Sequence, residues 1–191
     1  MAERRFSHAI AEGDGISVIA VVDDAEAARA AESQRAEALV VRGDPAAVRE
    51  ATSLPILWQV EGTLDEDSGA DAVMLPFDED DEDFDERHRR ALALGLDCAV
   101  EVGDEESLEV VLERVDPEIF LLSPNGGEDG DTPLETLLDL LANVPAGKLA
   151  IADLPGMTAL EVQELERAGC DAVIVRSLDL ASLVGESPPD V

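Results

Sequence analysis

One carboxylate stands where apolar strands seldom carry an acid. Glu101 lies in the segment Cys98-Ala-Val-Glu-Val, which separates two helical patterns and has the composition of a strand buried on both faces. Such strands rarely hold an unpaired acid. The carboxyl end of a strand in a parallel barrel is the exception, because side chains there open into the active-site mouth. Glu101 is therefore the first candidate for a catalytic residue, acting as a general base.

Other residues suited to catalysis are scarce. His8 and His88 fall on segments expected to form outer helices, so we expect both at the surface. Lys148 is the only lysine and precedes a strand, which places it at the end of a barrel opposite the mouth and excludes Schiff-base chemistry there. Cys98 and Cys170 have neither metal-site nor disulfide-framework spacing, so we expect buried thiols. We expect no metal and no cofactor.

Charge and hydropathy restrict the class of protein. The 191 residues carry 45 acidic and 13 basic side chains, for a formal net charge of −32, which repels nucleic acid and anionic membranes. The hydrophobic content of 46% fits one globular domain spanning residues 1–191. No apolar run reaches the roughly 18 residues of a membrane span, and the first residues lack the apolar segment of a secretory signal. We expect a cytoplasmic protein.

The acids are spread over the whole chain rather than gathered in one tail. Salt screens the repulsion within such a surface, so this composition is typical of proteins from salt-rich cytoplasm. We expect a halophilic source or salt-dependent stability.

Apolar, β-branched runs alternate with helical patterns along the chain. The expected strands are residues 16–22, 38–41, 55–60, 72–75, 98–102, 119–122, 149–152 and 172–175. The expected helices are residues 6–11, 24–35, 45–53, 82–94, 105–115, 133–142 and 158–168. The connection over residues 61–71 is too short and too broken for a full helix, and the tail from Ala181 has room for little more than one turn.

Eight strand-and-helix units with short connections predict an α/β fold, a compact (β/α)8 TIM barrel with shortened βα loops and one or two reduced helices. An internal repeat supports this. Gly69-Ala-Asp-Ala-Val-Met-Leu before the fourth strand matches Gly169-Cys-Asp-Ala-Val-Ile-Val before the eighth, which is the same place in each half of a barrel.

Six segments follow one another in a recognisable order. They are Ile16-Ser-Val-Ile-Ala, Ser53-Leu-Pro-Ile-Leu, Gly69-Ala-Asp-Ala-Val, the stretch from Leu94 to Leu108, Ala146-Gly-Lys-Leu and Ala168-Gly-Cys-Asp-Ala-Val-Ile-Val. In this order they resemble the indole-3-glycerol phosphate synthases, a family of ribulose-phosphate-binding barrels. The resemblance covers nearly the whole chain and is strongest around the fifth strand.

The resemblance implies a reaction that closes an indole ring on a phosphorylated, ring-opened sugar, with loss of carbon dioxide and water. It also implies catalytic Glu and Lys on the first strand, Lys on the third, Glu on the fifth, Asn on the sixth, Glu-Ser-Gly on the seventh, and phosphate-binding glycines near the seventh and eighth. Only Glu101 is kept. The other positions carry Val21, Asp23, Gln59, Ser123, Asp153-Leu-Pro and Arg176-Ser177.

The same alignment directs three acids, Asp23, Glu101 and Asp153, toward the mouth. Gln59, Asp153, Arg176 and Ser177 are the candidate substrate-binding residues. There are two alternatives for this pair. Arg176 and Ser177 bind a phosphate, whose oxygens suit the two-pronged guanidinium group, or Arg176 forms a salt bridge with Glu101 or Asp153.

Two functional classes follow. The resemblance also implies long loops after the first and second strands, which are short in this chain. Loss of these loops and of the catalytic lysines favours a non-catalytic scaffold or binding protein, a pseudoenzyme with at most a small phosphorylated ligand. The alternative is a lyase or isomerase of the tryptophan-biosynthesis type, acting on a phosphorylated sugar-derived substrate with Glu101 as general base. Either is expected as a monomer or a homodimer.

Overall fold

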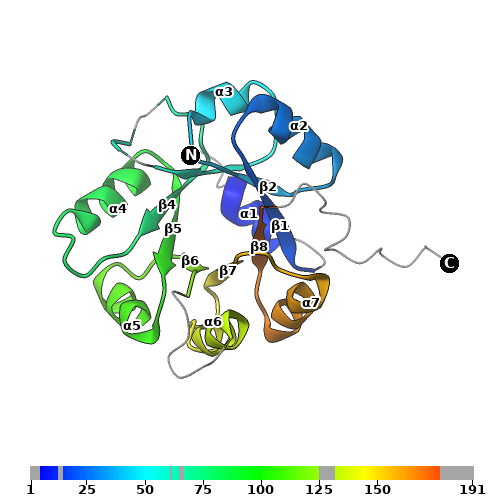
Figure 1. Cartoon of the computed structure of the whole chain (residues 1–191). Helices are drawn as coiled ribbons and strands as arrows, with labels where there is room; N and C mark the ends of the chain where they lie inside the picture. Colours follow the sequence, from blue (N-terminus) through cyan, green and yellow to red (C-terminus); the bar gives the residue numbers. More distant parts are fainter. Residues whose placement is uncertain (1–4, 13–14, 61, 65–66, 125–131, 177–191) are drawn as a thin grey trace.

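Eight parallel strands close into a ring in a computed structural model of the chain, with neighbours in the order β1 to β8 (Figure 1). The structure describes residues 5–12, 15–60, 62–64, 67–124 and 132–176. The predicted compact (β/α)8 barrel is confirmed. No helix among these residues is long and apolar enough to cross a membrane.

The boundaries agree closely with those expected from the sequence. The strands are β1 Ser17–Val22, β2 Ala38–Val41, β3 Ile56–Gln59, β4 Ala72–Pro76, β5 Asp97–Val102, β6 Ile119–Leu122, β7 Leu149–Asp153 and β8 Ala172–Val175. The helices are α1 Arg5–Ala11, α2 Ala25–Ser33, α3 Pro45–Arg49, α4 Phe84–Ala93, α5 Glu105–Arg114, α6 Pro133–Ala142 and α7 Ala159–Ala168. The largest difference is α3, which ends at Arg49 rather than Ser53.

Short polar residues begin the helices. The Asp24 side chain accepts hydrogen bonds from the backbone of Glu26 and Ala27, which starts α2 within three residues of β1. Thr132 and Thr158 form capping boxes at the starts of α6 and α7. After β1 and β2 the caps at Asp24 and Asp44 begin a helix within a few residues, so these two connections are short.

Two layers of apolar side chains form the core. One fills the barrel interior, where α1 closes the amino-terminal end with Phe6 and Ile10, both at most 2% exposed. The backbone N–H of Ser7 donates to the Asp97 carboxylate at 2.9 Å, which fixes α1 to the start of β5. The other layer lies between the strands and the outer helices.

The connection from β3 to β4 contains no helix in its described residues, 62–64 and 67–71, as expected. Leu64 fills part of the space that a helix would cover and is 4% exposed. Its carbonyl accepts a hydrogen bond from Arg90 of α4 at 2.9 Å. The expected shortening after β8 falls on residues outside the described part of the chain.

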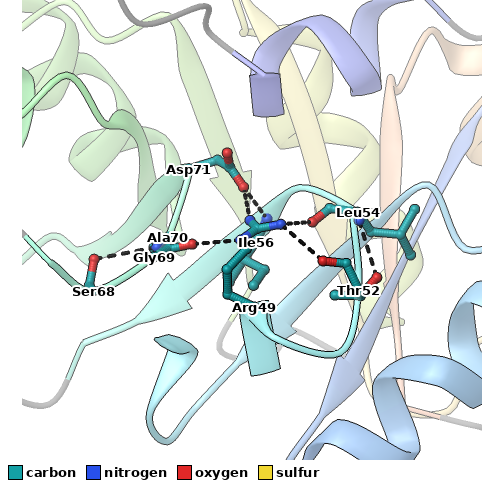
Figure 2. A network of polar contacts seen from close by, with 8 residues as sticks. All are labelled: Arg49, Thr52, Leu54, Ile56, Ser68, Gly69, Ala70 and Asp71. Atoms are coloured by element: carbon teal, nitrogen blue, oxygen red, sulfur yellow. Dashed lines mark hydrogen bonds and ion pairs between the residues drawn. The ribbon is translucent and has the colours of Figure 1, made fainter. Parts of the chain in front are cut away.

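Arg49 holds the second half of this connection (Figure 2). Its guanidinium donates to the carbonyls of Gly69 and Leu54, each at 2.9 Å, and pairs with the Asp71 carboxylate. Gly69 has a φ of +74°, and a Cβ there would lie 3.3 Å from the Arg49 Cβ, so the close approach requires glycine. One arginine thus links α3 to both strands that the connection joins.

The repeated segments have the same structural role in each half of the barrel. Gly69 and Gly169 both have a positive φ, +74° and +90°. The side chains of Asp71 and Asp171 each accept a hydrogen bond from a backbone N–H at the beginning of the preceding strand, β3 or β7, at 2.9 and 2.8 Å. The sequence repeat therefore corresponds to a repeated hydrogen bond, in which an aspartate before one strand binds the backbone of the preceding strand.

Candidate functional site at the barrel mouth

Four side chains from the odd-numbered strands point inward at the carboxyl end of the barrel. They are Val21 of β1, Gln59 of β3, Glu101 of β5 and Asp153 of β7, and all line one cavity of about 160 Å³. Alternate strands of such barrels contribute side chains to the same layer. The layer carries two carboxyl groups, one amide and one apolar side chain.

The even-numbered strands contribute the next layer outward. Arg42, Ser123 and Arg176 each follow directly after β2, β6 or β8 and also line the cavity. The fourth position of this layer is Pro76, which is exposed and does not line the cavity. Two cations and a hydroxyl therefore stand immediately above the acids and the amide.

Each polar group of the outer layer bonds to a group of the inner layer on a neighbouring strand. Arg42 Nε donates to Gln59 Oε1 at 3.2 Å, and Ser123 forms a side-chain hydrogen bond with Glu101. Both terminal nitrogens of Arg176 donate to the Asp153 carboxylate, Nη2 to Oδ2 at 2.7 Å. The mouth is thus organised as three donor–acceptor pairs.

Glu101 has an unusual electrostatic environment. Burial raises its pKa above the ordinary value of a glutamate, and the charge of Asp153 adds to this, while the hydrogen bond with Ser123 and the charge of Arg176 act in the opposite direction. The hydrogen bond to Asp153 raises the pKa of Arg176, which stays a cation. A carboxyl group that holds its proton longer than usual is suited to proton transfer nearer neutral pH.

The structure brings together Gln59, Glu101, Asp153 and Arg176, four of the five predicted site residues. Ser177, the fifth, lies outside the described residues. Of the two alternatives for Arg176, the salt bridge is present, to Asp153. Of the three acids that the resemblance directs toward the mouth, Glu101 and Asp153 line the cavity, whereas Asp23 follows directly after β1, is exposed and does not line it.

Sequence reasoning missed Arg42 as a mouth residue. A signal was present, because Arg42 follows β2 as Arg176 follows β8, and alternate strands place such residues in one layer. The resemblance gave no reason to examine this position.

The expectation that His88 lies at the surface is also wrong. His88 lies on α4 as predicted, but it is 6% exposed and stacks on Phe84 with ring centroids 6.4 Å apart. Burial lowers its pKa, which favours the neutral imidazole. It lines a second cavity, of about 120 Å³, with Leu92, Cys98 and the chain leading into β6. That cavity lies at the amino-terminal ends of β5 and β6, away from the mouth.

The remaining reactive groups are not part of the mouth. Cys98 and Cys170 are free and buried, as predicted, and burial raises the pKa of the Cys170 thiol to about 12. Lys148 pairs with Asp116 at 2.7 Å before β7, at the end opposite the mouth. Among the described residues, no three His, Cys, Asp or Glu side chains are grouped to hold a metal ion.

Comparisons with known proteins agree with the fold and with the sequence resemblance. No family model matches the chain. The indole-3-glycerol phosphate synthase of Geobacillus sp. strain WCH70 is 30% identical over 141 residues, which are 70% of this chain and 55% of that protein. The enzyme of the same name from Geobacillus kaustophilus is 29% identical over 136 residues, 68% of this chain and 53% of that protein. The chain therefore spans about half the length of the curated relatives it matches.

A solved structure of the N-acetylmannosamine-6-phosphate 2-epimerase from Clostridium perfringens superposes with a TM-score of 0.68 at 16% identity, covering 84% of this chain and 86% of that one. At that identity the likeness concerns the fold alone. The chain is thus a compact TIM barrel by fold, and its sequence is similar over about 70% of its length to part of the indole-3-glycerol phosphate synthases.

Proposed function

We propose that this protein is a non-catalytic relative of indole-3-glycerol phosphate synthase that binds a small phosphorylated compound at the barrel mouth and does not close the indole ring. The observation that carries this proposal is the composition of the inner layer. Val21 and Gln59 stand where the resemblance implies a glutamate and a lysine, so the layer holds no cation. Losses of single acid–base or charge-stabilising groups typically cost about 10²- to 10⁴-fold in rate.

The bonding at the mouth also supports a binding role. Arg176 donates hydrogen bonds to Asp153, and Glu101 is hydrogen-bonded to Ser123. These groups therefore already have protein partners at the mouth. Helices follow β1 and β2 almost at once, with N-caps at Asp24 and Asp44, so these two connections supply little chain to exclude water from a reaction.

The size of the cavity favours a small ligand. Its volume of about 160 Å³ is below the roughly 300–1,000 Å³ typical of pockets that enclose drug-sized molecules. An indole precursor carrying both an aromatic ring and a sugar phosphate would extend beyond it. A phosphorylated sugar, or the phosphorylated end of a larger compound, fits this volume better.

A steady-state assay with the family's anthranilate-ribulose phosphate substrate tests the loss of activity, with an active indole-3-glycerol phosphate synthase as the positive control. We expect no indole fluorescence above the uncatalysed rate. The variant V21E/Q59K restores the two residue types implied by the resemblance, and any activity it gains over the parent chain would locate the defect in the inner layer.

One observation favours a second candidate function, a lyase or isomerase reaction on a phosphorylated sugar-derived substrate. Glu101 lies in the cavity with a raised pKa, as a general base requires. Turnover of such a substrate that is abolished in E101Q would support this candidate against the non-catalytic one.

A further inference from the structure

The two arginines of the mouth differ in how their donors are used. Both terminal nitrogens of Arg176 are bonded to one carboxylate, that of Asp153. Arg42 uses its Nε for Gln59, and within the described part of the chain its two terminal amino groups have no protein partner. Arg42 therefore retains four N–H donors in the planar arrangement that suits an oxyanion.

The backbone around Arg42 is fixed by contacts on both sides. The preceding residue, Val41, pairs with Trp58 of β3, and the indole N–H of Trp58 donates to the carbonyl of Gly43 at 3.2 Å. Asp44 then caps α3 by accepting from the Ala46 N–H at 3.0 Å. A cation held in this way loses little conformational freedom when it binds a ligand.

The local charge differs from that of the molecule as a whole. The formal net charge of the chain is −32, whereas the cavity is lined by two arginines and two carboxyl groups. Asp153 offsets the charge of Arg176, and Glu101 lies beside Ser123 on the far side of the barrel from β2. Among the described residues, the charge of Arg42 is thus not offset by a paired carboxylate.

We propose that Arg42 is the anchor for the anionic group of the bound ligand, so that a small oxyanion binds at the end of β2 rather than at the β7–β8 side implied by the family resemblance. This inference rests on the proposed binding function. The ligand group is a phosphate monoester or a carboxylate. The terminal nitrogens of Arg42 bind its oxygens, while Gln59 holds the Arg42 Nε.

The chain supplies its own reporter for this site. Trp58 is the only tryptophan, and it contacts the residue next to Arg42. Tryptophan fluorescence is titrated with inorganic phosphate and, separately, with acetate, at constant ionic strength, and calorimetry provides a second readout. The variants are R42Q and the matched control R29Q, which removes the same charge from an exposed position on α2.

We expect saturable binding by the unmodified chain, a loss of about tenfold or more in affinity for R42Q, as for a missing charge-assisted hydrogen-bond pair, and a change within about twofold for R29Q. Thermal unfolding of R42Q serves as the folding control. A larger loss for phosphate than for acetate identifies the ligand as a phosphate ester, and the reverse identifies a carboxylate.

Two further outcomes separate this inference from the proposed function. Equal binding by R42Q and R29Q would overturn the role of Arg42 and leave a binding protein with its anion site elsewhere. Failure of the unmodified chain to bind either anion would overturn both the anchor and the binding role.

Discussion

The chemistry of the mouth depends on a few inward positions. Glu101 and Asp153 place carboxyl groups in the inner layer, while Val21 and Gln59 stand where the family resemblance implies a glutamate and a lysine. Arg176 pairs with Asp153. The proposed loss of ring closure rests on these few positions, since a barrel fold by itself does not determine function.

Glu101 gives a pH-dependent prediction for stability. Its pKa is raised in the folded state, so its contribution is greatest at low pH and is lost as the pH rises through the folded-state value. E101Q removes this loss and should therefore stabilise the protein more at pH 8 than at pH 5, as measured by denaturant unfolding in high salt.

Glu135 provides the opposite control. Its hydrogen bonds from Thr132 lower its pKa, so its contribution is present above the unfolded-state value and is lost as the pH falls. E135Q should therefore be destabilised relative to the parent at pH 8 and approach it at low pH. The same pH trend in both variants would contradict the assignment.

The inner layer of the site was predictable from the sequence because strand parity is strict. Once β3, β5 and β7 are located, Gln59, Glu101 and Asp153 must face the same interior. Asp23 does not join them in the cavity, because β1 stops at Val22 and the apolar pattern does not specify where that strand ends. His88 was expected at the surface because histidine is polar, and its residue type alone did not indicate that this face of the helix is buried.

At the scale of elements, side-chain contacts replace the helix absent from the described β3–β4 connection. Arg49 and Arg90 bond backbone carbonyls of this connection, and Leu64 supplies apolar contact. The same network explains why α3 is shorter than predicted. The Arg49 side chain also bonds the Leu54 carbonyl, which draws the chain out of the helix toward β3.

Removal of the Arg49 side chain should therefore be costly. R49Q leaves a half-buried Asp71 carboxylate without its cation and two carbonyls without a donor, so we expect a loss of about 2–4 kcal/mol in unfolding free energy. Denaturant unfolding measures this loss.

Arg89 is the matched control, since its ion pair with Glu86 is exposed on α4. R89Q should change stability by no more than about 0.5 kcal/mol. Similar small effects for both variants would show that the Arg49 network does not hold the connection.

Strand positions were predicted well because each strand is a short apolar run, and most of the helices between the strands begin at a clear cap. The sheet pairings then follow from the barrel topology. The position of Arg42 at the end of β2 was readable from strand parity, but its contact with Gln59 on the next strand was not. The repeat did carry structural information, because Asp71 and Asp171 make equivalent bonds.

At the scale of the whole molecule, self-repulsion is the dominant electrostatic feature. With a formal net charge of −32, unfolding separates like charges, whereas salt shortens the screening length from about 10 Å at 0.1 M to about 3 Å at 1 M. We predict that the thermal midpoint rises from low salt to molar sodium chloride.

Sucrose at matched osmolality separates screening from a general solute effect, because it strengthens burial without screening charge. The rise should be larger in sodium chloride than in sucrose. An equal rise in both, or no rise in sodium chloride, would show that the acidic surface does not limit stability.

The central proposal is that this barrel, although similar in sequence to indole-3-glycerol phosphate synthases, does not catalyse their reaction. The most direct measurement is a single-turnover incubation at high salt, with the protein in excess over the anthranilate-ribulose phosphate substrate. Indole product and remaining substrate are then quantified by mass. We predict complete recovery of unchanged substrate. Formation of indole product at a rate above a protein-free control would contradict the account and show that other residues perform the work of the missing lysines.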